Sequence, residues 1–170
     1  MTVLETERLL LSRLSYDDCE FIYELVNEPT FKKYIGDKNV SSLEDAHEYL
    51  KNGPIGSYEQ HGFGMFLVTA KADNTPLGIC GLVKRAQFEE PDLGFAFLKR
   101  FWSHGYALES SRAVMEFGMS QLGLQRIIAM ADPQNCASVR LLEKLGLLFE
   151  RTVRMDGDSH DIHLFATESK

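Results

Sequence analysis

The spacing of apolar and polar positions divides the chain into short strands interleaved with a few helices. Short apolar runs bounded by Gly, Pro, Asn or Asp predict β-strands, and apolar residues spaced three and four apart predict helices. The predicted strands are residues 8–14, 64–70, 77–86, 92–99, 126–131, 147–154 and 159–167. The predicted helices are residues 16–27, 41–52, 105–122 and 137–145.

The order of these elements predicts a mixed α/β protein of the α+β type, with one mostly antiparallel sheet of about seven strands and about four flanking helices. Strands 92–99 and 126–131 should form a parallel pair, because the long helix 105–122 connects them and a parallel pair needs such a crossover. Residues 28–40 and 53–62 contain Pro and Gly and are predicted to be loops. No linker or repeat interrupts residues 1–170, so a single domain is expected.

Two of the predicted helices begin with the sequence of a capping box. In this motif a serine and an acidic residue three positions later each bond the backbone N–H of the other. Ser15 and Asp18 fit the motif before the first helix, and Ser41 and Glu44 fit it before the second. Gly146 is expected to end the last helix.

Charge and cysteine content exclude several classes of protein. The formal net charge is −7 and no long basic run occurs, which argues against binding along a nucleic-acid backbone and favours cationic partners such as amines. Cys19, Cys80 and Cys136 are odd in number and form no CxxC pair, so we expect reduced thiols and no metal site. No stretch approaches the ~20 apolar residues that span a membrane, and the first residues do not resemble a secretory signal. A cytoplasmic protein is therefore expected.

The end of strand 92–99 carries the first candidate for chemistry. The chain passes through Ser103-His104-Gly105 directly into the long helix, which places a helix N-terminus at a strand end. Free backbone N–H groups and the helix dipole make such a point suitable for a phosphate. A tight turn that only packs a small-residue helix on the sheet is the alternative. Two other phosphate loops, GxxxxGK[ST] and GxGxxG, do not occur.

Five segments in order resemble one known family. They are T-E-R-L-L-L, W-S-H-G-Y-A-L-E-S, G-L-Q-R-I, P-x-N-x-x-S with L-E-K-L-G, and the late G-D-S-H-D-I-H-L-F. Together they are similar to the GNAT acetyltransferase superfamily, within the branch of the ribosomal-protein N-terminal acetyltransferases RimJ and RimL. The superfamily motif is Q/R-x-x-G-x-G/A, in which Trp102 takes the first position and Gly105 and Ala107 are the small pair. Ser103 departs from the branch, which usually has Gly there.

The resemblance implies acetyl-CoA as co-substrate and no metal. Its pyrophosphate would lie on the backbone amides of residues 103–107, and its pantetheine arm would run between two splayed parallel strands along the edge of residues 94–98. Asp92, Gly94 and Ala96 would face one side of that strand, and Leu93, Phe95 and Phe97 would face the core. The predicted cofactor-binding residues are Phe97, Leu98, Trp102, Ser103, His104, Gly105, Tyr106, Ala107 and Asn135.

The resemblance also implies the catalytic groups. Many members use a Tyr as the acid for the leaving thiolate, but Leu142 stands at that position here. In the RimJ and RimL branch the Ser of N-x-x-S is the proposed donor, which is Ser138; Asn135 would orient the cofactor. Capping of the last helix is the alternative role for both residues. The general base is suggested by position and not by the resemblance: Asp92 starts strand 92–99 on its small face and could reach the amine directly or through water. Glu89 and Glu90 compete with it, and a solvated loop charge is the alternative.

The implied reaction is direct acetyl transfer to a primary amine. A protein N-terminal α-amino group is expected as acceptor, as in the branch, with Tyr34 and Asp161 as candidate acceptor-binding residues. A small amine such as a polyamine or a drug is an alternative acceptor, and a catalytically silent CoA-binding module or a phosphate-free interaction domain is an alternative function. Assembly as a homodimer is left open.

Overall fold

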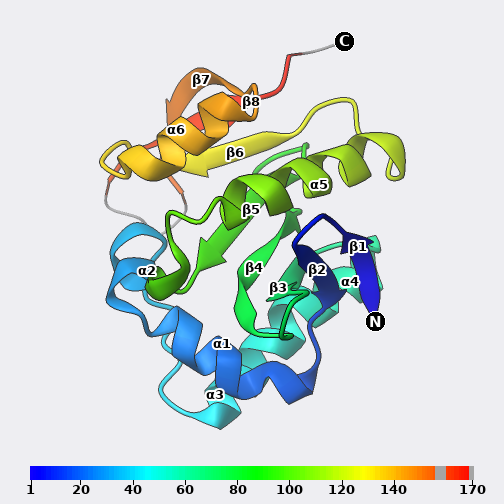
Figure 1. The fold of residues 1–170 in the computed structure, drawn as a ribbon. Coiled ribbons are helices and arrows are strands. Elements are labelled where there is room, and N and C mark those ends of the chain that lie inside the picture. Colours follow the sequence, from blue (N-terminus) through cyan, green and yellow to red (C-terminus); the bar gives the residue numbers. More distant parts are fainter. Residues whose placement is uncertain (156–159, 169–170) are drawn as a thin grey trace.

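The computed structural model describes residues 1–155 and 160–168 (Figure 1). The strands are β1 (Thr2–Glu5), β2 (Leu9–Arg13), β3 (Met65–Ala70), β4 (Pro76–Val83), β5 (Asp92–Phe97), β6 (Ile128–Ala131), β7 (Leu148–Val153) and β8 (Ile162–Ala166). The α-helices are α1 (Cys19–Val26), α2 (Pro29–Tyr34), α3 (Leu43–Leu50), α4 (Gly56–His61), α5 (Tyr106–Ser120) and α6 (Cys136–Lys144). Three short helical turns complete the list: η1 (Tyr16–Asp18), η2 (Lys51–Ile55) and η3 (Lys99–Phe101).

In the described residues all eight strands belong to one sheet, in the order β1-β2-β3-β4-β5-β6-β8-β7. The β5–β6 pair is parallel and every other neighbouring pair is antiparallel. This confirms the predicted mixed sheet and its parallel pair. The prediction missed β1, because a four-residue strand that pairs with β2 at the edge of the sheet shows no clear alternation of its own.

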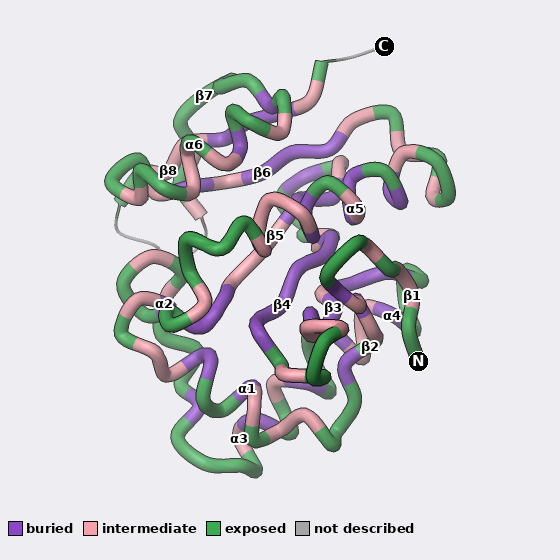
Figure 2. The backbone as a smooth tube through the Cα atoms, viewed as in Figure 1, coloured by how far each residue is buried: buried purple, intermediate pink, exposed green. Residues whose placement is uncertain are grey.

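Two cores lie on opposite faces of the sheet. One contains Val114 and Phe117 of α5 and Leu142 of α6, and the other contains Ile22 of α1 and Leu50 of α3. Figure 2 shows buried backbone concentrated along the central strands between these layers. The sheet therefore carries α5 and α6 on one face and α1 and α3 on the other.

Both segments predicted to be loops contain helix: residues 29–34 of the first, and residues 53–61 of the second. Residues 29–34 form α2 because Pro29 at the first helical position has its φ preset and needs no N–H partner there. Beyond α3 the chain continues through the π-helical η2 into α4, although Pro54 lies inside η2. The wider turn accommodates a residue that has no N–H to donate, so this proline does not end the helix.

The predicted helix starts are confirmed with one shift. Ser15 and Asp18 form a capping box around η1. The cap of the second helix lies one residue later than predicted, because Ser42 rather than Ser41 accepts from the Asp45 backbone N–H, at 3.0 Å. The predicted capping box of Ser41 and Glu44 is therefore wrong, and α3 begins at Leu43. Gly146 follows α6 with φ +88°, as the glycine predicted to end that helix.

The long helix α5 lies close to the sheet because its inward side chains are small. Ser110 and Ser111 are fully buried, and the Ser111 hydroxyl lies 3.6 Å from the Cys80 sulfur of β4. The Ser110 hydroxyl donates to the Tyr106 carbonyl at 2.8 Å, which satisfies it within the helix. No helix of the described residues is long and apolar enough to span a bilayer.

We expect Leu142→Ala to lower the free energy of unfolding by about 2–5 kcal/mol, because Leu142 is fully buried and truncation leaves a cavity. Leu148→Ala is the matched control, since Leu148 is 56% exposed and its truncation should change stability by no more than ~0.5 kcal/mol. Chemical unfolding curves of both variants test this. Equal losses would contradict the placement of Leu142 in the core.

Candidate active site

The turn between β5 and α5 has an unusual backbone. Ser103 has φ +66° and Gly105 has φ +81°, both in the left-handed region. Glycine adopts this conformation freely, whereas Ser103 adopts it at a cost. The Trp102 indole N–H donates to the Phe97 carbonyl at 2.9 Å, which ties the turn back to the end of β5. The predicted motif therefore forms a compact loop at the strand end.

The loop presents free donors at the N-terminus of α5. Within the described chain, the first N–H of this helix that bonds to backbone is that of Glu109, which donates to the Gly105 carbonyl at 3.0 Å. The N–H groups of Gly105, Tyr106 and Ala107 precede it and have no backbone acceptor among the described residues. With the positive end of the helix dipole, they suit a phosphate group.

The same loop is held from the far end of the sequence, by contacts that sequence reasoning missed. Glu109 of α5 accepts from the Thr6 hydroxyl at 2.7 Å and from Arg8 Nε at 2.7 Å. Arg8 Nη1 in turn donates to the His104 carbonyl at 2.9 Å. Burial alone would raise the pKa of Glu109, but the hydrogen bonds from Thr6 and Arg8 and the charge of Arg8 leave it below its usual value. The segment T-E-R-L-L-L carried this signal only as part of the family resemblance.

The parallel strands β5 and β6 separate soon after they meet. Their pairing is confined to two positions, Asp92 with Ile128 and Leu93 with Ala129, and the strands diverge in Figure 1. Ile128 N donates to the Pro91 carbonyl, so alternate residues onward from Pro91 direct their backbone groups toward β6. Phe95 thus presents N–H and C=O groups to a gap between the strands.

The residues of β5 and its end that were predicted to bind the cofactor differ in whether their backbone N–H and C=O groups are already hydrogen-bonded. The Phe97 carbonyl is already occupied by Trp102, which leaves its N–H on the β6 side. Leu98 is fully buried, its N–H donates to Leu77 and its carbonyl accepts from Phe101. Leu98 therefore has no free backbone group for a ligand, whereas Phe95, which was not predicted, has both.

Asp92 lies at the point where β5 and β6 meet and is 3% exposed. Its carboxylate accepts from Arg85 Nε at 2.7 Å. Burial raises its pKa above the usual value, and the charge of Arg85 opposes that shift without cancelling it. Its competitors are placed differently: Glu89 is exposed, and the Glu90 carboxylate lies 3.7 Å from Arg126.

The start of α6 separates the roles of Asn135 and Ser138. The Asn135 side chain caps the helix by accepting from the Ser138 backbone N–H at 3.3 Å. The Ser138 side chain is half-buried, and its hydroxyl has no hydrogen-bond partner among the described residues. The alternative role of capping thus applies to Asn135 and leaves the Ser138 hydroxyl free.

The remaining predicted residues are more peripheral. His104 is exposed and its ring stacks on Tyr106, with Nδ1 2.8 Å from the Trp102 carbonyl. Tyr34 is the last residue of α2, half-buried, with the Lys33 ammonium over its ring. Asp161 is exposed and pairs with Arg154 at 3.1 Å. Among the described residues, no hydrogen bond, ion pair or ring contact links Tyr34 or Asp161 to the loop at Gly105.

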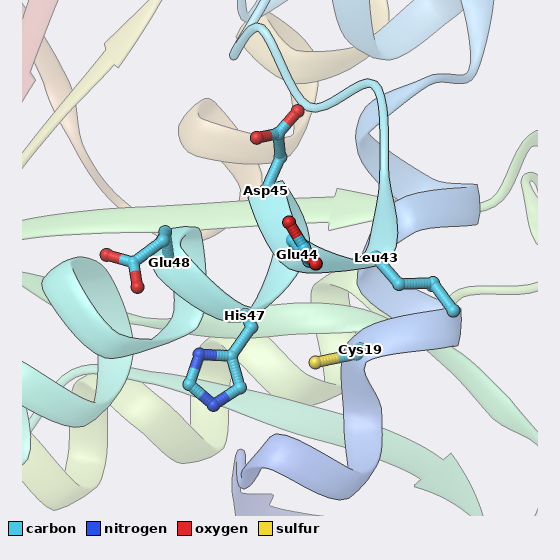
Figure 3. A pocket seen from close by; sticks show the side chains of 6 residues that line it. All are labelled: Cys19, Leu43, Glu44, Asp45, His47 and Glu48. Atoms are coloured by element: carbon cyan, nitrogen blue, oxygen red, sulfur yellow. The ribbon is translucent and has the colours of Figure 1, made fainter.

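A surface pocket of about 510 Å³ lies between α1 and α3 (Figure 3) and contains none of the predicted site residues. Its lining residues are Cys19, Leu43, Glu44, Asp45, His47 and Glu48. Asp45 is engaged by Ser41, and His47 stacks on Tyr16. Within the described residues no group of three His, Cys, Asp or Glu side chains is arranged to hold a metal ion.

Comparisons with known proteins identify the family of this chain. Residues 8–148 match the model of the acetyltransferase (GNAT) domain. The uncharacterized protein YkkB of Bacillus subtilis is 30% identical over 159 residues, covering 90% of this chain and 89% of YkkB. The uncharacterized N-acetyltransferase YoaA of the same organism is 28% identical over 169 residues, covering 96% and 95%.

Among solved structures, the RimL ribosomal L7/L12 α-N-protein acetyltransferase in complex with coenzyme A shares the fold. Its TM-score is 0.82 at 17% identity, with 98% of this chain and 97% of that chain covered. The open edge of β5, the amide-bearing loop at Gly105 and the matched domain lead to one assignment. This chain belongs to the GNAT acetyltransferase family and is an acyltransferase.

Proposed function

We propose that this N-acetyltransferase uses acetyl-CoA to acetylate the N-terminal α-amino group of a protein by direct attack. The observation that carries the proposal is the junction of two features: the strand edge opened by the divergence of β6 and the free-amide loop at the end of the same strand. An edge suits the amide groups of a pantetheine arm, and the loop suits a pyrophosphate. The CoA complex of RimL, a protein of the same fold, supports this use of the site.

The residues of the loop and strand divide the work of binding. Gly105, Tyr106 and Ala107 would hold phosphate oxygens through their N–H groups. Phe95 and Phe97 would align the arm through the backbone groups that face β6. Ser103, His104 and Trp102 would shape the loop, and Asn135 would fix the start of α6 beside it.

The transfer step needs a base for the amine and an acid for the thiolate. The amine nitrogen attacks the thioester carbonyl, the C–N bond forms, the C–S bond breaks, and the sulfur takes up a proton. We assign the acid to Ser138, whose hydroxyl has no partner in the described chain, and the base to Asp92, directly or through water. The raised pKa of the Asp92 carboxyl makes its ionised form a stronger base than an exposed aspartate.

The acceptor rests on the likeness to RimL, the L7/L12 α-N-protein acetyltransferase. Tyr34 and Asp161 are our candidates for contact with it. A small polyamine is the second candidate acceptor, favoured by the net charge of −7. The three cysteines are unpaired, which is consistent with our placement of the protein in the reducing cytoplasm.

We expect acetyl-CoA to raise the melting temperature and NADH to leave it unchanged. A ligand at 100 times its dissociation constant stabilises a protein by ~2.7 kcal/mol. Thiol release is then measured with a peptide bearing a free N-terminus, the same peptide with its N-terminus blocked, and spermidine. No thermal shift at millimolar acetyl-CoA would contradict the assignment of acetyl-CoA as co-substrate. Turnover of spermidine and of neither peptide would show that the acceptor is a small amine and not a protein N-terminus.

Gly105→Glu should abolish CoA binding, because its β-carbon would lie 3.2 Å from Arg8 Nη2 and its carboxylate would compete with Glu109 for Arg8, which distorts the loop proposed to hold the phosphate. Gly123→Glu is the matched control. Gly123 also has positive φ, +68°, but lies at the opposite end of α5 with open space around it. Both variants should lose stability through backbone strain, and only the first should lose CoA binding by calorimetry. Equal CoA binding by the two folded variants would show that the phosphate site is elsewhere.

Ser138→Ala should lower kcat by roughly ten- to a hundredfold, at or below the low end of general acid catalysis because a thiol leaves readily. Its stability and its affinity for CoA should stay near wild type, since the hydroxyl bonds no described residue. Asn135→Ala, in contrast, should cost about 1 kcal/mol of stability by removing the cap. Steady-state rates and unfolding curves of both variants distinguish a catalytic role from a capping role. A wild-type kcat in the Ser138→Ala variant would refute the role of Ser138 as the acid.

A further inference from the structure

The turn of the N-terminal hairpin is joined to α5 by hydrogen bonds to the side chain of Glu109. Both oxygens of Glu109 are used: Oε1 accepts from the Thr6 hydroxyl at 2.7 Å and from the Arg8 backbone N–H at 2.9 Å, and Oε2 accepts from Arg8 Nε at 2.7 Å. Figure 1 shows the β1–β2 turn beside α5. A carboxylate that receives three donors, two of them from Arg8, fixes where the guanidinium lies.

The Arg8 guanidinium, held by Glu109, also contacts the loop of residues 103–107. Arg8 Nη1 donates to the His104 carbonyl at 2.9 Å, and the guanidinium lies 4.7 Å from the centre of the Tyr106 ring. A β-carbon added at Gly105 would lie 3.2 Å from Arg8 Nη2, so the loop packs directly on this side chain.

The geometry of the peptide bond determines what this contact does. The peptide between His104 and Gly105 is trans, and in a trans peptide the C=O and N–H groups point in opposite directions. Because Arg8 lies on the carbonyl side, the Gly105 N–H points away from Arg8. Arg8 thus stands behind the loop, and the N–H is directed toward the side on which we place the phosphate.

The loop needs such support because its backbone is strained. Two left-handed residues, Ser103 at φ +66° and Gly105 at φ +81°, flank His104. Glycine tolerates this conformation, but a serine pays for its β-carbon, so the free loop would favour other conformations. A hydrogen bond from a fixed cation to the intervening carbonyl opposes that tendency.

We infer that Arg8, held by Glu109, is a positioning residue that orients the His104–Gly105 peptide so that the loop can bind a phosphate of the cofactor. The inference rests on the proposed acetyl-CoA site. It also explains how the loop holds its shape although Ser103 stands where glycine would be unstrained.

The test uses CoA affinity, measured by calorimetry, together with unfolding curves. We expect Arg8→Ala to weaken CoA binding about tenfold, the equivalent of one charged hydrogen bond. Glu109→Gln should weaken it less, because the amide oxygen still accepts from Thr6 or Arg8. Lys71→Ala is the matched control: it breaks the Lys71–Glu5 ion pair that also involves β1, without touching the loop, and should leave CoA affinity within about twofold.

A double-mutant cycle with Ser103→Gly distinguishes positioning from direct contact. Glycine relieves the strain that Arg8 opposes, so the Arg8→Ala effect on CoA affinity should shrink to about threefold or less in the Ser103→Gly background. The KM for acetyl-CoA should follow the same pattern while kcat changes little. CoA and 3′-dephospho-CoA should show the same loss, because the loop and not an individual phosphate is affected.

Three results would overturn the inference. If the Arg8→Ala variant unfolds more easily but binds CoA with wild-type affinity, the contact between Arg8 and the His104 carbonyl is purely structural. If Arg8→Ala weakens CoA binding as much in the Ser103→Gly background as in the wild type, Arg8 touches the cofactor itself. Wild-type protein that binds no CoA would overturn the proposed function, and the inference with it, and is distinguished from the other two by the wild-type measurement alone.

Discussion

The early separation of β5 from β6 is the constraint on which the site depends. Parallel neighbours normally continue to pair along their length, yet here pairing stops after Leu93 and Ala129. The Phe95 N–H and C=O and the Phe97 N–H are left without strand partners among the described residues, which would be unfavourable unless another amide-bearing group occupied the gap. The long crossover helix α5 begins at the same end of β5, so the gap and the helix N-terminus are fixed together.

The packing of α5 makes this arrangement possible. Ser110 and Ser111 are buried against β4 and keep the helix close to the sheet, so its N-terminal amides lie near the end of β5. Leu142 packs α6 into the same core, and Asn135 caps its first turn. Both helices begin on the side where β5 and β6 diverge (Figure 1), so their N-termini lie toward the same end of the parallel pair.

Asp92, which is buried, and Glu109, which is half-buried, have pKa values shifted in opposite directions. Asp92 is desolvated and keeps a raised pKa despite its contact with Arg85, which suits a group that exchanges protons. Glu109 has a lowered pKa because three donors stabilise its charged form, which suits a group that must remain an acceptor. The depth of burial and the number of donors that reach each carboxylate together decide the direction of its pKa shift.

The sequence by itself determined the features that depend on neighbours along the chain. The order of strands β2 to β8 and of helices α1, α3, α5 and α6, the capping box at Ser15, and the glycine at the start of α5 all follow from local periodicity and backbone preference. Tertiary structure decided what depends on residues distant in sequence. Arg8 meets Glu109 across 101 positions, Phe95 is freed only because β6 diverges, and Pro54 stays within a helical turn that α3 and α4 continue. These contacts follow no local period, because the sheet and its crossover bring them together in space.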